Sequence, residues 1–431
     1  MLWLYRLLFI PALLVIAPRY LLRMWKRGGY RTGFLQRFGG HPVLPPKTGA
    51  TRRLWLQAVS VGEVLAITPV IEALQRDGVE VYLTTTTSTA YRLARDRLGS
   101  LTVGIGYFPL DWWPFSSRAW QRLDPDLAII TEGERWPEHL RQAARRGIPV
   151  LSVNARLGDR SFALLRRFRP AARLVLEGVT RHLPASTLDE ARLVELGVPR
   201  QRVTTTGNLK LDVAIPPLPL GERAQLRRDL GLPDGPVLLG SSTWPGEEAA
   251  LLAALQQIRR AGLRCALLLV PRHAERGGEL DRWLAATGES FHLRSRGRAP
   301  GEVAIAVADT TGELRRLTQL ADVVFVGKSL APHTEGQTPV EAAALGKAIL
   351  FGNGMSNFRA IARELVETGA ARQIADPAAL GVAVRGLLEN ATAREALAAA
   401  AAAWHRRNAG ATARTLDAIR ASLAPRPPAG R

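Results

Sequence analysis

The sequence is poor in cysteine, and several common catalytic motifs are missing from it. Cys265 is the only cysteine among 431 residues, so no internal disulfide can form, which is consistent with a reducing compartment. The chain has no HExxH or CxxC motif, no EF-hand loop and no GxSxG nucleophile elbow. The segment 327–329 matches only the end of a Walker A motif, because Asp322 stands where that motif needs glycine. Zinc-protease, dithiol, calcium, hydrolase and P-loop sites are therefore not predicted.

Acidic residues are absent from the first 62 positions. That stretch holds ten basic residues, half of the formal net charge of +20, which favours an anionic partner. Residues 2–22 are largely apolar and about long enough either to cross a bilayer or to lie in its surface. The basic flank that follows favours a cytoplasmic location for the rest of the chain. We predict that residues 1–27 form a membrane anchor; the alternative is that this segment is a helix of the hydrophobic core. The predicted anionic partner is a membrane surface and not nucleic acid.

The rest of the chain alternates apolar strand-like runs with helical patterns, which is typical of parallel α/β sheets. The rhythm stops at a proline-rich stretch near residue 215 and then restarts. Two Rossmann-like domains are predicted, over residues 28–214 and 223–420, with a linker at 215–222 and a tail at 421–431. Strands are expected at 54–60, 80–86, 126–131, 148–154, 173–178, 202–208, 236–243, 265–271, 303–309, 322–327 and 348–352. The alanine-rich segment 394–407 is expected to be a helix.

The first predicted strand runs into Ser60-Val61-Gly62-Glu63, and Glu63 is the first acidic residue of the chain. Ser60 and Glu63 have the spacing of a capping box, in which the two residues satisfy each other's backbone amides at a helix start. The carboxyl end of a parallel strand is also where open α/β sheets bind ligands. Glu63 is therefore either a cap or a general base, and this stretch alone does not decide between them.

Polar residues follow other predicted strands as well. Each has a structural explanation, as a helix cap or a solvated side chain. Taken together, several helix N-termini and the guanidinium of Arg272 describe a site for a monophosphate. The polar residues that follow predicted strands are Glu132, Glu134 and Lys210 in the first half of the chain, and Arg272, His273, 311–313 and 338–341 in the second.

Many short segments of the chain, in their order and spacing, resemble the 3-deoxy-D-manno-octulosonic acid (Kdo) transferase family. They include AVSVGE, TEGERWP, IPVLSVNARL, GNLKLD, STWPGEE, VPRH, DTTGEL and ALGKAILFGNGMSNF, and they span nearly the whole chain. The resemblance implies a glycosyltransferase-B fold, with two Rossmann-like domains facing a cleft. It also implies transfer of Kdo from CMP-Kdo to a lipid A precursor in lipopolysaccharide biosynthesis, with no metal and no cofactor. The expected location is the cytoplasmic face of the bacterial inner membrane.

The resemblance also assigns roles to residues. Glu63 matches the family's catalytic base, and Glu132 and Lys210 match its transition-state-stabilising pair. The positions that match its CMP contacts are Pro271, Arg272, Thr311, Gly312, Glu313, Thr338, Pro339, Val340 and Glu341.

The chain departs from the family pattern near the last of these sites. Lys328 replaces a glycine, while Gln337 and Thr338 replace a histidine and an asparagine; Gly133 and Arg135 replace a threonine and a leucine. Two alternatives therefore stay open: a transferase of the same fold that uses another nucleotide sugar, and a non-catalytic membrane-bound glycolipid-binding protein. The number and linkage of Kdo residues and the oligomeric state are not predicted.

Overall fold

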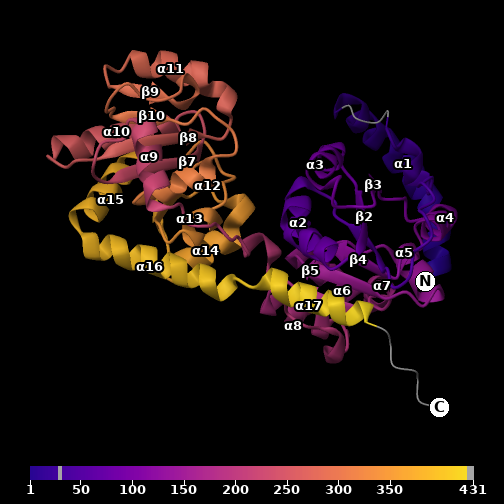
Figure 1. Ribbon diagram of the computed structural model, residues 1–431. Coiled ribbons are helices and arrows are strands. Elements are labelled where there is room, and N and C mark those ends of the chain that lie inside the picture. The colour runs from indigo at the N-terminus through magenta and orange to yellow at the C-terminus, as the bar shows by residue number, and fades with distance from the viewer. Residues whose placement is uncertain (28–31, 425–431) are drawn as a thin grey trace. The chain divides into compact units, whose positions relative to one another are not determined.

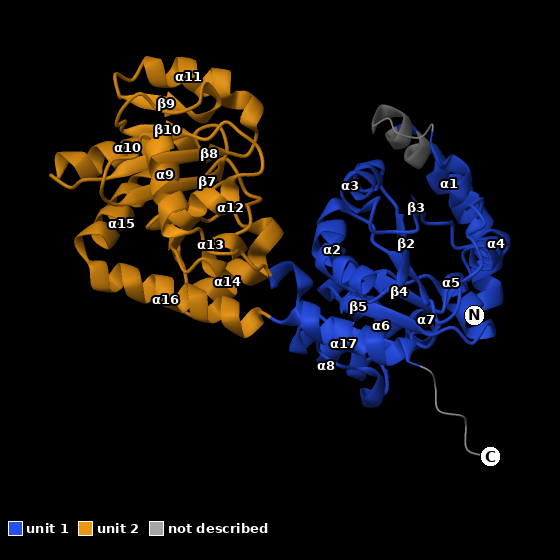
Figure 2. Cartoon of the chain, in the orientation of Figure 1, with its two compact units in different colours: residues 1–212, 410–431 blue, residues 213–409 orange. Residues whose placement is uncertain are grey.

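The computed structural model describes residues 1–27 and 32–424, which form two α/β units (Figures 1 and 2). Unit 1 comprises Met1–Asp212 together with Gly410–Arg431, and unit 2 comprises Val213–Ala409. Residues 28–31 and 425–431, which include most of the predicted tail, lie outside the described part.

Unit 1 is built on a parallel sheet with the strand order β3-β2-β1-β4-β5-β6. Its strands are β1 (Arg53–Gln57), β2 (Glu80–Thr85), β3 (Gly104–Tyr107), β4 (Leu127–Thr131), β5 (Val150–Ala155) and β6 (Arg181–Pro184). Its helices are α1 (Leu2–Arg27), α2 (Val61–Arg76), α3 (Ser88–Leu98), α4 (Trp113–Leu123), α5 (Pro137–Arg145), α6 (Asp159–Arg167), α7 (Arg169–Leu176), α8 (Thr187–Glu195) and α17 (Ala411–Leu423).

Strand β1 shows why helices cover both faces of this sheet. Leu54 and Leu56 are fully buried in one apolar cluster with residues of α2, α3 and α17. Trp55, which points to the opposite face, belongs to a second cluster with residues of α4 and α5. A strand buried on both faces carries a continuous apolar run, and this run made the strand recognisable in the sequence.

Unit 2 repeats the architecture with the strand order β13-β12-β11-β7-β8-β10-β9, again parallel. Its strands are β7 (Val237–Thr243), β8 (Ala266–Pro271), β9 (Phe291–Leu293), β10 (Ile305–Val307), β11 (Val323–Val326), β12 (Ala348–Gly352) and β13 (Arg372–Ile374). Its helices are α9 (Leu220–Leu230), α10 (Glu247–Arg260), α11 (Gly277–Ala285), α12 (Leu314–Leu317), α13 (Val340–Ala344), α14 (Arg359–Glu367), α15 (Pro377–Glu389) and α16 (Ala391–Asn408). The two predicted α/β units with parallel sheets are thus confirmed.

The last helix belongs to unit 1, although the sequence placed residues 223–420 in one domain. Asp212 explains the return, because its carboxylate accepts hydrogen bonds from the amides of Gly410 at 2.8 Å and Thr412 at 2.6 Å. Leu416 and Ile419 of α17 then join the apolar cluster of α2. The predicted linker at 215–222 likewise runs into α9, which starts at Leu220.

Two of the predicted strands are wrong. Residues 173–178 run through the end of helix α7, since Ala172 and Leu176, four positions apart, are buried on one face of it. Residues 202–208 contribute only an isolated bridge between Val203 and His182, and the strand of this region is β6. The sequence also missed β3, β6, β9 and β13, which are short edge strands of the two sheets.

Helix α1 is attached to unit 1 through buried polar groups. The Tyr5 hydroxyl donates a hydrogen bond to Asp111 at 2.6 Å, and the Arg6 guanidinium donates two to Glu138, at 2.7 and 3.0 Å. Both carboxylates are almost fully buried. In the described part of the chain, no helix is both long enough and apolar enough to cross a bilayer. The anchor predicted over residues 1–27 is therefore unconfirmed, and its surface-lying form stays a prediction.

Candidate active site

Glu63 lies at the start of α2, where β1 ends, and its carboxylate is held by three donors. Ser60 Oγ is 2.9 Å from Oε1, while the Val59 amide and Thr131 Oγ1 are 3.0 and 2.5 Å from Oε2. Ser60 also caps the helix by accepting from the Glu63 amide at 3.4 Å. The capping interaction therefore exists, but the carboxylate reaches the amide of Val59 and not that of the cap residue. The same contacts orient Glu63 as a fixed acceptor, so capping and base roles are compatible.

Glu132 and Lys210 form an ion pair beside Glu63. Their Oε1 and Nζ atoms are 2.5 Å apart, and both side chains are partly exposed. A β-carbon added at Gly62 would lie 3.9 Å from Lys210 Nζ, which places the ammonium next to the N-terminus of α2. Lys210 projects from a short 3₁₀ turn, Leu209–Leu211, started by Asn208. The structure thus brings the three predicted catalytic residues of unit 1 together.

Glu134 follows the same strand as Glu132, and it belongs to the same group although the sequence predicts no role for it. Its carboxylate accepts a hydrogen bond from the Trp136 indole at 2.6 Å. Burial, together with the charges of Glu63 and Glu132, raises the pKa of Glu134 to about 7. Three carboxyl groups and one ammonium therefore share this corner of the sheet.

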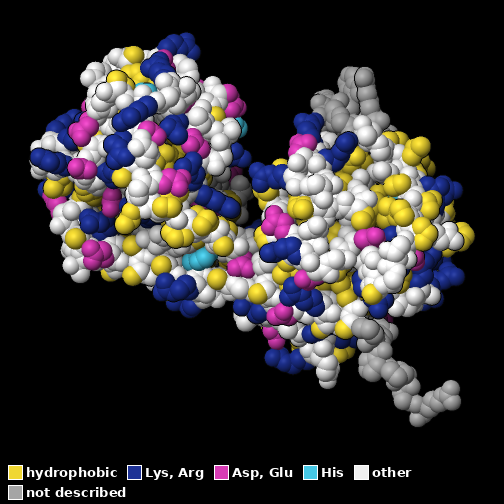
Figure 3. All heavy atoms as spheres, in the orientation of Figure 1, with side chains coloured by type: hydrophobic (Ala, Val, Ile, Leu, Met, Phe, Trp, Pro, Cys, Tyr) yellow, Lys and Arg dark blue, Asp and Glu magenta, His cyan; other side chains and the backbone are white. Residues whose placement is uncertain are grey.

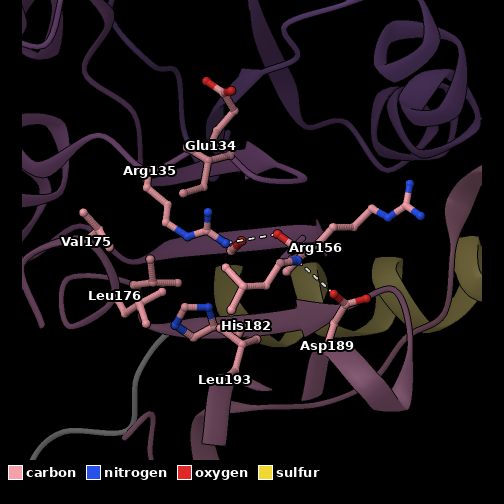
Figure 4. A pocket seen from close by; sticks show the side chains of 13 residues that line it. Glu134, Arg135, Arg156, Val175, Leu176, His182, Asp189 and Leu193 are labelled. Atoms are coloured by element: carbon pink, nitrogen blue, oxygen red, sulfur yellow. Dashed lines mark hydrogen bonds between the residues drawn. The ribbon is translucent and has the colours of Figure 1, made fainter. Parts of the chain in front are cut away.

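A small cavity lies next to this group, at β5 and β6 (Figure 4). Arg135 donates from its guanidinium to the carbonyls of Gly133 and Arg156, each at 3.0 Å, and Glu134 points away from it. Nε2 of His182 is buried there and has no partner among the described residues. The cavity measures about 10 Å³, which fits about one water molecule and no sugar.

The residues predicted to contact CMP lie at the carboxyl ends of β8 and β10 and at the start of α13 in unit 2. Pro271 is the last residue of β8, and the exposed guanidinium of Arg272 makes no hydrogen bond or ion pair with the residues that the structure describes. Glu341 is mostly buried; its Oε1 is 3.7 Å from Arg315, and its Oε2 has no hydrogen-bond partner within the described ranges. A free guanidinium suits phosphate, and a buried acceptor without a donor suits hydroxyl groups.

The turns before α12 and α13 differ from the helix N-termini that the sequence predicted for phosphate binding. Helices α12 and α13 have only four and five residues, so their dipoles contribute little. Thr338 accepts from the amide of Val340 at 3.3 Å, but Glu341 does not reach back, so the expected capping box is not formed. Pro339 directly precedes Val340, the first residue of α13. The phosphate site predicted from the sequence would therefore depend on Arg272 more than on helix ends.

The turn at 311–313 is held by its own acidic residue. Gly312, which follows Thr311, has φ 84°. The Glu313 carboxylate accepts hydrogen bonds from the Thr310 hydroxyl and the Arg294 guanidinium. Burial alone would raise the pKa of Glu313, but these two donors outweigh it and lower the pKa below its usual value. Glu313 is thus a charged, positioned acceptor at the N-terminus of α12, in the loop after β10.

Comparison with known proteins identifies the family. A family model described as 3-deoxy-D-manno-octulosonic-acid transferase (kdotransferase) matches residues 31–213. The 3-deoxy-D-manno-octulosonic acid transferase of Bordetella pertussis is 36% identical over 427 residues, which cover 95% of this chain and 97% of that protein. The transferase of the same name from Haemophilus influenzae is 32% identical over 422 residues, or 97% and 95% of the two chains. The chain belongs to the Kdo transferase family.

Solved structures show the fold over more than four fifths of the chain. UDP-GlcNAc 2-epimerase from Neisseria meningitidis, bound to UDP-GlcNAc, aligns with a TM-score of 0.56 over 86% of this chain and 99% of that chain. Its sequence is 13% identical, so this likeness shows a glycosyltransferase-B-like fold and nothing of the reaction.

Strained backbone occurs near the candidate catalytic residues of unit 1 and near the candidate donor-binding residues of unit 2 in this Kdo transferase family member. Among described non-glycine residues, positive φ occurs at Asp124 in a helix-ending turn and at four other positions. Glu132 and Asn154 have φ 52° in unit 1, and Ser242 and Lys328 have φ 54° and 57° in unit 2. Asn154 Nδ2 lies 3.4 Å from Glu132, and its Oδ1 accepts from the Leu209 amide. Strained backbone clusters at functional sites. Asn154 and Ser242 lie in the family-like segments IPVLSVNARL and STWPGEE, but the sequence predicted no role for either residue.

Glu134→Gln should reduce the loss of thermal stability as the pH rises. The folded-state pKa of about 7 lies above the unfolded value, so folding takes up protons and stability falls between roughly pH 4.5 and 7. Glutamine keeps the acceptor for Trp136 but does not titrate. We expect the Tm of the variant to exceed that of the native protein more at pH 8 than at pH 5, as measured by calorimetry. An equal difference at both pH values would show that Glu134 titrates normally.

Proposed function

We propose that this protein is an inverting glycosyltransferase that transfers Kdo from CMP-Kdo to a lipid A precursor, with Glu63 as the general base. The observation that supports it most is the group formed by Glu63, Glu132 and Lys210 at one corner of the unit 1 sheet. Family membership indicates sugar transfer, and this group supplies a proton acceptor and a positive charge for that reaction.

The attacking group in such a transfer is a weakly nucleophilic alcohol. A carboxylate that accepts its proton typically accelerates the step about 10²–10⁴-fold. Glu63 suits this role because its orientation is fixed by Ser60, Val59 and Thr131. The proton of the alcohol moves to the carboxylate of Glu63 as the alcohol oxygen bonds to the anomeric carbon and CMP leaves from that carbon. Lys210, paired with Glu132, provides positive charge that can stabilise anionic groups in the transition state.

The donor residues of unit 2 fit a nucleoside monophosphate. Arg272 offers a free guanidinium for the phosphate, and the unpartnered Oε2 of Glu341 can accept from ribose hydroxyls. We propose that no metal ion or other cofactor takes part, because one phosphate needs less countercharge than a diphosphate. Turnover should then be unaffected by EDTA.

We also propose that α1 rests on the anionic cytoplasmic face of the inner membrane, where the lipid acceptor lies. Trp3, Leu7 and Leu14 fall on one side of the helix and are 70%, 65% and 68% exposed. Figure 3 shows hydrophobic side chains gathered on this part of unit 1. Tyr5 and Arg6 instead point to the domain, so an apolar outer face coexists with a polar inner one. Such a helix is typical of surface binding.

Replacing Trp3, Leu7 and Leu14 together by glutamine should weaken binding to anionic vesicles at least about tenfold, since each apolar side chain contributes roughly 1.5–3 kcal/mol when buried. Tm and activity on a detergent-dispersed acceptor should change little, because the inner contacts remain. Leu220→Gln, an exposed apolar position of unit 2 (85%), is the matched control and should bind vesicles normally. Native-like vesicle binding by the triple variant would exclude α1 as the membrane contact.

A donor and acceptor panel tests the proposed function. Purified protein is incubated with CMP-Kdo or with UDP-sugars, with and without a tetra-acylated lipid A precursor, and nucleotide release is measured. We expect release of CMP from CMP-Kdo only when the lipid is present. Turnover of another nucleotide sugar alone would favour the same fold with a different donor, and no turnover with any donor would favour a glycolipid-binding protein.

A further inference from the structure

Lys328 is a second cation at the sheet edge that carries the donor residues. It lies two positions after the end of β11 and has φ 57°, a left-handed backbone conformation that favours glycine, the residue of the family pattern here. Its backbone is fixed on both sides, because its amide donates to Glu247 at 2.7 Å and its carbonyl accepts from the Gly336 amide at 2.7 Å. The direction in which the side chain leaves the backbone is therefore set by the fold.

The Lys328 ammonium is held over an aromatic ring. Nζ lies 4.2 Å from the ring centroid of Trp244 and 3.2 Å from Oε1 of Glu335. The Lys328 side chain is 18% exposed and that of Glu335 is 42% exposed, so the ammonium is the more enclosed partner. Nε1 of Trp244 is buried without a hydrogen-bond partner in the described part of the chain.

Strand order places this group beside Arg272. Trp244 follows β7, which lies between β11 and β8 in the sheet, and Lys328 and Arg272 follow those two neighbours. The backbone links confirm the register: the Arg272 amide donates to Thr243 at 3.1 Å, and the Gly327 amide donates to Ser241 at 2.8 Å. Two cations thus flank one aromatic residue at the same edge.

Stability does not account for a lysine at this position. A left-handed conformation is unfavourable for any residue with a β-carbon, and a partly exposed lysine–glutamate pair contributes little to folding. A strained non-glycine residue whose charge is held in place is more typical of a binding site.

We propose that Lys328 binds the carboxylate of the sugar that is transferred and so selects donors whose sugar is itself an acid. The inference rests on the proposed function, in which the donor has two anionic groups, the phosphate and the carboxylate of Kdo. Arg272 binds the phosphate, and Lys328 binds the carboxylate. Glu335 holds the ammonium in the absence of donor, and the donor carboxylate takes its place, so one ion pair replaces another.

The test compares the KM for CMP-Kdo with the inhibition constant of CMP, which lacks the sugar. Lys328→Met should raise the KM roughly tenfold or more, as expected for a lost charge-assisted contact, and leave inhibition by CMP unchanged. Arg272→Ala should weaken both. Glu335→Gln should lower the KM, because it removes the competitor of the donor carboxylate. Lys328→Gly relaxes the backbone, so it should fold and show the same rise in KM, and Lys328→Arg should restore part of the affinity.

Several results would overturn the assignment. An unchanged KM in Lys328→Met and Lys328→Gly would show that the lysine does not contact the donor. Equal weakening of CMP-Kdo and CMP would place Lys328 on the phosphate. The same loss in Glu335→Gln as in Lys328→Met would identify a purely structural ion pair. A native protein that does not turn over CMP-Kdo would overturn the proposed function and this inference with it, whereas native turnover with unaffected Lys328 variants overturns the inference alone.

Discussion

Glu63→Gln should lower kcat by about 100-fold or more, while Tm and the affinity for CMP stay close to native. Glutamine has the size and shape of glutamate, and its amide fits the same surroundings. Its oxygen can accept from the Val59 amide and Thr131, and its NH₂ group can donate to Ser60 Oγ. Only the ability to take a proton is lost. The effect should fall on kcat because proton transfer belongs to the transition state.

Two variants on the same helix separate the base from the cap. Ser60→Ala removes the cap and should cost about 0.5–2 kcal/mol of stability with a smaller effect on kcat. Glu72→Gln changes an exposed glutamate of α2 and should alter neither quantity. A near-native kcat in Glu63→Gln would restrict Glu63 to the helix cap, and Glu132 would then be the next candidate for the base.

Lys210→Met should lower kcat by about 10²–10³-fold, as the loss of a positioned electrostatic donor typically does. The lysine is the cation that balances Glu132, and without it Glu63, Glu132 and Glu134 repel one another. Steady-state rates over a range of pH would measure the effect.

A double-mutant cycle identifies the pair as a unit. Because Glu132 and Lys210 are in direct contact, Glu132→Gln combined with Lys210→Met should cost far less than the two single losses added together. Lys47→Met is the matched control: Lys47 pairs with Asp126 at 3.0 Å in the same unit but outside this group. If Lys47→Met and Lys210→Met lost equal activity, the loss in Lys210→Met would be due to general destabilisation of the unit.

The sequence predicted the fold best where burial is continuous. Strands such as β1, β4 and β8 are buried along their length and were recognised from their apolar runs. Edge strands were missed because they carry little of that signal: β3 has two glycines in four residues, and β13 has exposed Arg372 and Gln373. The strand expected at 173–178 failed because a short apolar run fits a helix face equally well.

The domain boundary at the C-terminus was not predictable from local patterns. It depends on Asp212, whose partners Gly410 and Thr412 lie about two hundred positions later in the chain. Alanine-rich helical sequence looks the same whether it packs on one sheet or on another. Only the pairing of distant residues decides between them.

The candidate catalytic residues were found because each lies in a family motif that follows a predicted strand, although the strand predicted before Lys210, at 202–208, does not form. Glu63, Glu132 and Lys210 do lie together, whereas their chemical roles remain predictions. The role that we propose for Lys328 could not be foreseen, because it depends on a backbone angle and on the position of Trp244. A departure from the family pattern indicated where to look but not what the residue does.

The most direct measurement of the central claim is the mass of the acceptor lipid after reaction. Purified protein is incubated with CMP-Kdo and a tetra-acylated lipid A precursor, in the presence of EDTA, and the lipid is analysed by mass spectrometry. We predict that native protein adds one or more Kdo residues, and that Glu63→Gln leaves nearly all of the lipid at its starting mass over the same time. Unmodified lipid after incubation with folded native protein, or equal modification by Glu63→Gln, would contradict the account.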